Sequence, residues 1–211
     1  MMEYLWGYRF LISYLIGALP FAVFVPWLFT GLNLLVLGSG NPGTTNVYRV
    51  LSACVSKPLA IVVTILVGVL DIGKGWLPGF LFPGSRTIAP LFAVLGHVYS
   101  PFLGFAGGKG VGTFYGALLG ATGNPKYIIV PLIWIGITFA KATSKLFEVE
   151  NEWINFGFFK IKVSFFNSLI CMSTGMIMLA LDNLPGNTFW QFFIILCLIA
   201  SLHYKHVTLA D

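Results

Sequence analysis

Charged side chains are scarce in this sequence, where Asp, Glu, Lys and Arg together make up 9% of the 211 residues. A soluble domain carries roughly 25% charged residues, so the composition excludes one. Hydrophobic residues make up 57% and the mean hydropathy is +0.88, which makes lipid the expected solvent. Because lipid cannot pair with backbone polar groups, only helices or a closed barrel can cross it. Residues 59–70 are apolar on every side, which favours helices over the alternating pattern of a barrel.

Cysteine is rare as well, with 3 residues and no C-x-x-C pair among them. This scarcity argues against a disulfide framework and a cysteine-based metal site, and we predict no metal and no cofactor. Acidic residues number 7 against 12 Lys and Arg, for a net charge of +5. In a soluble protein that excess would suggest binding to nucleic acid. In a membrane protein, however, basic residues accumulate in cytoplasmic loops. We therefore predict contact with the lipid bilayer and none with nucleic acid.

The apolar runs predict about seven membrane-spanning helices in a single domain covering residues 1–211. The expected spans are 5–29, 58–80, 87–105, 112–122, 127–141, 163–181 and 188–204. The first run is longer than the roughly 7–15 apolar residues of a signal peptide and lacks an A-x-A cleavage pattern, so we interpret it as a retained span. The expected fold is an all-helical integral membrane protein.

Basic residues predict the orientation of the chain. If the N-terminus lies outside, the cytoplasmic side holds eight of the 12 basic residues and the outer side three, with Lys74 inside a span. The excess of positive charge on cytoplasmic loops favours this arrangement. It also places two unusual polar loops, 31–57 and 105–111, at the same cytoplasmic face.

The first polar loop contains residues 38–49, which read GSGNPGTTNVYR. Glycine and asparagine permit positive φ, so successive backbone N–H groups can converge into a nest that binds an anion. Arg49 adds a planar, charged fork suited to phosphate, and Thr45 or Asn46 is a candidate cap for a short helix over residues 46–57. The alternative is an ordinary polar turn between spans. The phosphate-binding candidates of this loop are Ser39, Gly40, Asn41, Gly43, Thr45, Asn46 and Arg49.

The second polar loop contains residues 107–113, which read GGKGVGT and precede a predicted helix. Small residues let the backbone approach an anion closely, and Lys109 adds a positive charge. A Walker A loop is excluded, because Gly104 lies one residue too close to Gly108 and Gly110 replaces the hydroxyl residue that would bind magnesium. A phosphate nest at a helix N-terminus, without metal, agrees better with the sequence. Its candidate residues are Gly107, Gly108, Lys109, Gly110 and Thr113.

The helix after this loop carries glycine at positions 112, 116 and 120. Small residues four apart form a groove in which a second helix packs closely. We predict a structural role for this part.

Buried ionisable groups form the remaining candidates. Asp71 and Lys74 lie three residues apart in the second predicted span and would meet on one helical face. Unpaired, each would cost about 2.5–3.5 kcal/mol in the membrane, so we predict an ion pair, which either supports the helix bundle or lies near substrate. The histidines are His97, expected to be a supporting hydrogen-bonding residue, and His203 and His206 at the end of the last span, either of which is a candidate base or phosphate donor.

These segments resemble the PlsY family of acyl-phosphate:glycerol-3-phosphate acyltransferases of the bacterial inner membrane. The resemblance is carried by residues 39–49, by Gly96-His97 followed by 107–113, and by 12–21 and 71–75. It implies seven spans, an external N-terminus and a cytoplasmic-side active site. It further implies transfer of a fatty acyl group from acyl phosphate to the 1-hydroxyl of glycerol 3-phosphate, which yields lysophosphatidate.

The resemblance also implies roles for individual residues. Ser39 and Arg49 would contact substrate phosphate, Lys109 and the surrounding glycines would form the second phosphate cradle, and Asn46 would support them. Ser164 and His206 match a substrate-contacting serine and the histidine of the family's final motif. That motif departs from the family at Leu209, where asparagine is expected. The alternative functions are a small-anion transporter and a family relative without activity.

Overall fold

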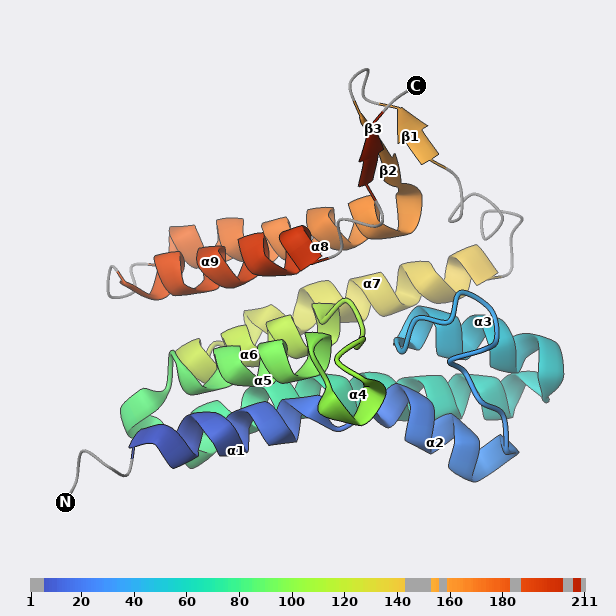
Figure 1. The fold of residues 1–211 in the computed structure, drawn as a ribbon, viewed down its shortest axis with the longest axis horizontal. Coiled ribbons are helices and arrows are strands. Elements are labelled where there is room, and N and C mark those ends of the chain that lie inside the picture. The colour runs from blue at the N-terminus through green and yellow to red at the C-terminus, as the bar shows by residue number, and fades with distance from the viewer. Residues whose placement is uncertain (1–5, 143–152, 156–158, 183–186, 203–206, 210–211) are drawn as a thin grey trace. The chain divides into compact units, whose positions relative to one another are not determined.

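The computed structural model describes residues 6–142, 153–155, 159–182, 187–202 and 207–209 (Figure 1). By internal packing the chain divides into two compact units, Met1–Ile128 and Ile129–Asp211. The first unit contains the helices α1 (Trp6–Ala18), α2 (Phe21–Thr30), α3 (Thr44–Cys54), α4 (Lys57–Leu81), α5 (Ala89–Val98) and α6 (Val111–Thr122). Helix α7 (Lys126–Ala142) begins at the boundary, and the second unit holds α8 (Val163–Leu181), α9 (Asn187–Leu202) and the strands β1 (Trp153–Asn155), β2 (Phe159–Lys162) and β3 (Val207–Leu209).

Each of the seven predicted spans contains a helix in the part of the chain that the structure describes. Within the described residues, two helical segments, Gly7–Thr30 and Lys57–Leu81, are long and apolar enough to cross a membrane. The apolar helices Ala89–Leu103, Ser168–Leu181 and Asn187–Cys197 are shorter. A helix is therefore confirmed at the place of each predicted span.

Large apolar side chains cover the outer faces of α1, α2 and α4. Leu11, Phe24, Trp27, Val62 and Val69 are examples, with exposed fractions between 53% and 61%. A soluble protein rarely leaves such side chains in extended contact with water, whereas lipid tails accommodate them. The surface of the first unit therefore agrees with a lipid environment.

The first predicted span is divided into two helices, α1 and α2, which run end to end in Figure 1. Pro20 causes the break, because proline has no N–H to donate and its ring clashes with the preceding turn. Two carbonyls at the break find partners on other helices or loops. The hydroxyl of Ser100 donates to the carbonyl of Ala18 (2.6 Å), and the ammonium of Lys74 donates to that of Leu19 (2.9 Å).

Helices α4 and α6 pack closely along the predicted row of glycines. A Cβ added at Gly116 would collide with the backbone carbonyl of Ile72, and one at Gly120 would lie 2.8 Å from the carbonyl oxygen of Trp76. The approach is reciprocal, because Gly75 of α4 lies equally tightly against the backbone of α6. The predicted structural role of this row is confirmed, and α4 is the partner helix.

Replacing Gly116 by alanine is expected to lower the free energy of unfolding by about 1–3 kcal/mol, the usual cost of overpacking. The carbonyl of Ile72 belongs to a helix backbone and cannot move aside alone. Gly112→Ala is the matched control, since its Cβ would make an ordinary 3.5 Å contact with the side chain of Asp71. Thermal unfolding in detergent measures both variants, and equal melting temperatures would contradict the packing described.

The second unit contains a feature that the sequence did not predict. Strands β1, β2 and β3 form an antiparallel sheet in that order, and β2 leads directly into α8. The strands are only three or four residues long, too short for an alternating pattern to be recognised. The prediction of an all-helical fold is therefore corrected here, because β1 and β2 precede α8 and β3 follows α9.

Candidate functional site

Asn46 organises the first polar loop from inside α3. Its side-chain oxygen accepts the backbone N–H of Ser39 at 2.8 Å, and its side-chain nitrogen donates to the carbonyls of Leu34 (3.2 Å) and Leu37 (3.1 Å). The side chain is buried. These three hydrogen bonds make Asn46 an anchor for the loop, and we find no geometry that would turn it towards a ligand.

The short helix after this loop differs from the prediction at both ends. Helix α3 begins at Thr44 with Gly43 in an extended conformation as its N-cap, and no side chain caps it. The prediction that Thr45 or Asn46 caps the helix is therefore wrong. The helix ends at Cys54 and not at 57, because Lys57 begins α4 and is followed by proline, which is favoured in a first turn.

Backbone N–H groups of the first loop point into the loop itself. Gly40 donates to the carbonyl of Leu37 (3.0 Å) and Gly43 to that of Asn41 (2.9 Å), while the N–H of Asn41 donates to the hydroxyl oxygen of Ser39 (3.4 Å). Gly40 has the expected positive φ of 67°. These N–H groups of the predicted nest are thus used in hydrogen bonds within the loop. The backbone donors left for an anion are those in the first turn of α3, because a helix cannot satisfy the N–H groups of its own first turn.

Backbone N–H groups of the second polar loop are also used in hydrogen bonds within the protein. Gly107 donates its N–H to the carbonyl of Val98 (2.9 Å), and Gly108 donates to that of His97 (3.2 Å). Gly110, with a φ of 75°, is the N-cap of α6, again without a side-chain cap. The N–H groups of Gly107 and Gly108 are therefore used within the protein, so the predicted anion site would have to draw on the first turn of α6 and on Lys109, which is half-buried.

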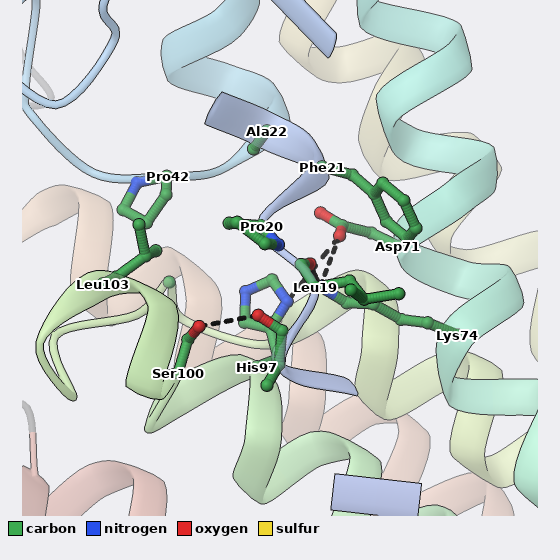
Figure 2. A pocket seen from close by; sticks show the side chains of 12 residues that line it. Leu19, Pro20, Phe21, Ala22, Pro42, Asp71, Lys74, His97, Ser100 and Leu103 are labelled. Carbon is green, nitrogen blue, oxygen red and sulfur yellow. Dashed lines mark hydrogen bonds and ion pairs between the residues drawn. The ribbon is translucent and has the colours of Figure 1, made fainter. Parts of the chain in front are cut away.

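The two polar loops meet. A Cβ added at Gly108 would lie 2.6 Å from the carbonyl oxygen of Pro42 and would collide with the Nε2 atom of His97. Figure 2 shows Pro42 and His97 facing the same small pocket. The two loops therefore touch close to Gly43 and Gly110, the glycine N-caps of α3 and α6.

A buried ionic network lies beneath this junction. The carboxylate of Asp71 pairs with the ammonium of Lys74 at 2.8 Å and lies 3.8 Å from the Nδ1 atom of His97. Asp71 and Lys74 are both 5% exposed. The predicted ion pair is confirmed, and the further contact of Lys74 with the carbonyl of Leu19 shows that it also stabilises the break between α1 and α2.

Thr113 points away from the surface of the loop. Its hydroxyl lies 3.0 Å from the Nδ1 atom of His97, and its side chain is fully buried. Thr113 was predicted to bind phosphate, and its hydroxyl is engaged by a histidine, so any contact with phosphate would have to use its backbone N–H in the first turn of α6. Sequence reasoning missed this pairing, as it missed Ser100, although both residues are polar positions in apolar surroundings.

The remaining predicted residues are distributed as follows. Ser39 is exposed in the first loop, and Thr45 and Arg49 lie half-buried in α3. Ser164 lies in the first turn of α8, in the second unit. His203 and His206 lie outside the described residues. Among the described residues, no three His, Cys, Asp or Glu side chains gather into a group that would hold a metal ion.

Comparison with known proteins identifies the relatives of this chain. A sequence model of the family described as glycerol-3-phosphate acyltransferase matches residues 8–209. The glycerol-3-phosphate acyltransferase of Macrococcus caseolyticus is 36% identical over 167 residues, which cover 76% of this chain and 78% of that protein. The Staphylococcus saprophyticus protein of the same name is 39% identical over 144 residues, which cover 61% of this chain and 66% of that protein.

Two solved structures share the fold. The crystal structure of PlsY (YgiH), an integral membrane glycerol 3-phosphate acyltransferase, in its glycerol 3-phosphate form matches with a TM-score of 0.67 and 28% identity, covering 94% of this chain and 88% of that one. Its lysophosphatidic acid form gives a TM-score of 0.66 with 28% identity, covering 94% of this chain and 87% of that one. The match includes the C-terminal third, where the motif resemblance in the sequence is weakest.

Proposed function

The chain belongs to the glycerol-3-phosphate acyltransferase family, and from that premise we propose that it transfers a fatty acyl group from acyl phosphate to the 1-hydroxyl of glycerol 3-phosphate. The observation that carries the proposal is the family match over residues 8–209. One relative, solved in a glycerol 3-phosphate form and in a lysophosphatidic acid form, supports the acceptor and the product. The donor rests on the resemblance of the motifs and on the chemistry of the site.

Two phosphate groups must be held near each other in this reaction, one on each substrate. The first turns of α3 and α6, which follow the two touching loops, suit that task, because helix N-termini present N–H donors and a positive dipole end to anions. Arg49 and Lys109 add positive charge, and Ser39 adds a hydroxyl donor at the surface of the first loop. Ser164 and His206 complete the proposed set of substrate contacts.

The transfer itself replaces one bond at the acyl carbon by another. The hydroxyl oxygen of glycerol 3-phosphate forms an ester bond with that carbon, the bond from carbon to the phosphate oxygen breaks, and phosphate leaves. The hydroxyl proton goes to the departing phosphate or to His206. Since acyl phosphate is already activated, the protein has mainly to position the substrates and stabilise charge.

The proposed arrangement in the membrane follows from charge. Seven spans with the N-terminus outside place eight of 12 basic residues and both polar loops at the cytoplasmic face of a bacterial plasma membrane. The substrates' phosphates then approach from the aqueous side. The apolar helices provide the surroundings in which a fatty acyl chain is soluble.

The direct test uses the purified full-length protein in lipid nanodiscs with palmitoyl phosphate and radiolabelled glycerol 3-phosphate. We expect labelled lysophosphatidate, with no product when palmitoyl-CoA replaces palmitoyl phosphate. Product with palmitoyl-CoA alone would overturn the donor assignment. Phosphate flux in liposomes without any acylated product would overturn the enzymatic function.

A further inference from the structure

His97 lies at the place where the two polar loops meet, but it is separated from solvent. We propose that it is a positioning residue, which holds the first turns of α3 and α6 at the spacing that two phosphate groups require. The inference rests on the proposed acyl transfer and adds a role for the Asp71–His97–Thr113 network in substrate binding. His97 acts through the loops and does not touch the substrates.

Main-chain and side-chain atoms of the 97–98 segment contact the second loop at the point where it meets the first. The carbonyl of His97 accepts the N–H of Gly108 (3.2 Å), and the carbonyl of Val98 accepts that of Gly107 (2.9 Å). The Nε2 atom of His97 and the carbonyl oxygen of Pro42 both lie against Gly108, on the side where any other residue would carry its Cβ. The imidazole ring is therefore part of the contact that fixes the distance between the loops.

The other edge of the ring fixes its orientation. Its Nδ1 atom lies 3.0 Å from the hydroxyl of Thr113 and 3.8 Å from the carboxylate of Asp71, whose charge Lys74 balances. Thr113 belongs to the first turn of α6, so the ring joins the loop to the helix that the loop precedes. Because the ring is buried and held from two sides, its orientation is fixed. We infer that this fixed ring in turn sets the position of both loops.

The size of the pocket bears on whether these side chains position the loops or touch the substrates directly. The pocket is lined by residues that include Asp71, Lys74, His97, Leu19, Pro42 and Gly108 (Figure 2). Its volume is about 10 Å³, which is enough for roughly one water molecule. Glycerol 3-phosphate and acyl phosphate are far larger than this space, which agrees with a role for these side chains in holding the loops.

Thr113→Val is the decisive variant, because it keeps the shape of the side chain and removes only the hydroxyl that meets His97. We expect KM for both phosphorylated substrates to rise about tenfold, with a much smaller change in kcat and a melting temperature close to that of the wild type. Thr113→Ser retains the hydroxyl and should restore wild-type KM. Thr64→Val is the matched control, since Thr64 is also buried but donates to a carbonyl of its own helix, that of Ala60.

A double-mutant cycle tests whether the effect passes through the imidazole. In a His97→Ala background, Thr113→Val should raise KM no further, because residues of one hydrogen-bonded network are not additive. Unchanged KM in Thr113→Val, or an equal rise in Thr64→Val, would overturn the inference. A wild-type protein without acyl transfer would overturn the proposed function instead, so the two failures are distinguishable.

Discussion

Arg49→Ala is expected to reduce kcat/KM for lysophosphatidate formation by about 10²–10³-fold, the usual loss when one charged or strongly polar donor is removed from a reacting group. Arg49 lies in the second turn of α3, half-buried behind the Thr44–Asn46 turn that begins the helix. A guanidinium there would supply a permanent charge and paired donors to a phosphate bound, as proposed, at the helix N-terminus. The measurement is steady-state acyl transfer at varied concentrations of each substrate.

Two further variants define what the charge contributes. Arg49→Lys keeps the positive charge and loses the planar fork, so it should recover only part of the activity. Lys57→Ala removes one positive charge from an exposed residue at the beginning of α4, and it should retain wild-type activity. If Arg49→Ala were as active as Lys57→Ala, Arg49 would have no part in substrate binding.

Helices with long apolar runs were predictable almost to the residue. The span predicted at 58–80 is α4 at Lys57–Leu81, because nothing interrupts its apolar surface and Pro58 suits a first turn. The span predicted at 5–29 is two helices, α1 and α2, since Pro20 breaks the first. Sequence alone identifies proline as a candidate kink, but the break is complete only because Lys74 and Ser100 reach the carbonyls that it leaves unpaired.

The meeting of the two polar loops was predictable, whereas their hydrogen bonds were not. Residue types alone indicated two anion-binding loops, and the contact of Gly108 with Pro42 agrees with the expectation that they converge. The direction of the backbone N–H groups was not predictable. Asn46 takes the N–H of Ser39, and the carbonyls of the 97–98 segment take those of Gly107 and Gly108, through contacts between distant positions that no local pattern encodes.

Buried polar pairs also show that contacts between distant residues are hard to predict from sequence. Asp71 and Lys74 are three residues apart, so helical geometry alone predicted their ion pair. The contact of His97 with Thr113 joins residues 16 positions apart on different helices, and it depends on the fold as a whole. A polar residue inside an apolar helix therefore indicates that a partner exists without indicating which one.

Gly108→Ala is expected to remove most of the activity, by about a hundredfold, because a displacement of roughly 1 Å in a binding site can cost that much. The added methyl group would lie 2.6 Å from the carbonyl oxygen of Pro42 and would collide with His97, so the two loops must move apart. Gly108 is not among the residues with positive φ, so the backbone conformation permits alanine there. Only the lack of space for its methyl group opposes the substitution.

The control for Gly108→Ala is the same substitution where the structure leaves room. Gly73, in the middle of α4, has no atom within 4 Å of an added Cβ, and alanine there should preserve activity and slightly raise stability, because it favours the helix over glycine. Both proteins are compared by acyl transfer and by thermal unfolding in the same detergent. Folded Gly108→Ala protein with low activity would agree with loops held at a fixed spacing. Wild-type activity in that variant would mean that the reaction does not depend on the contact between Gly108 and Pro42, and the two helix N-termini would then have to bind their phosphates independently.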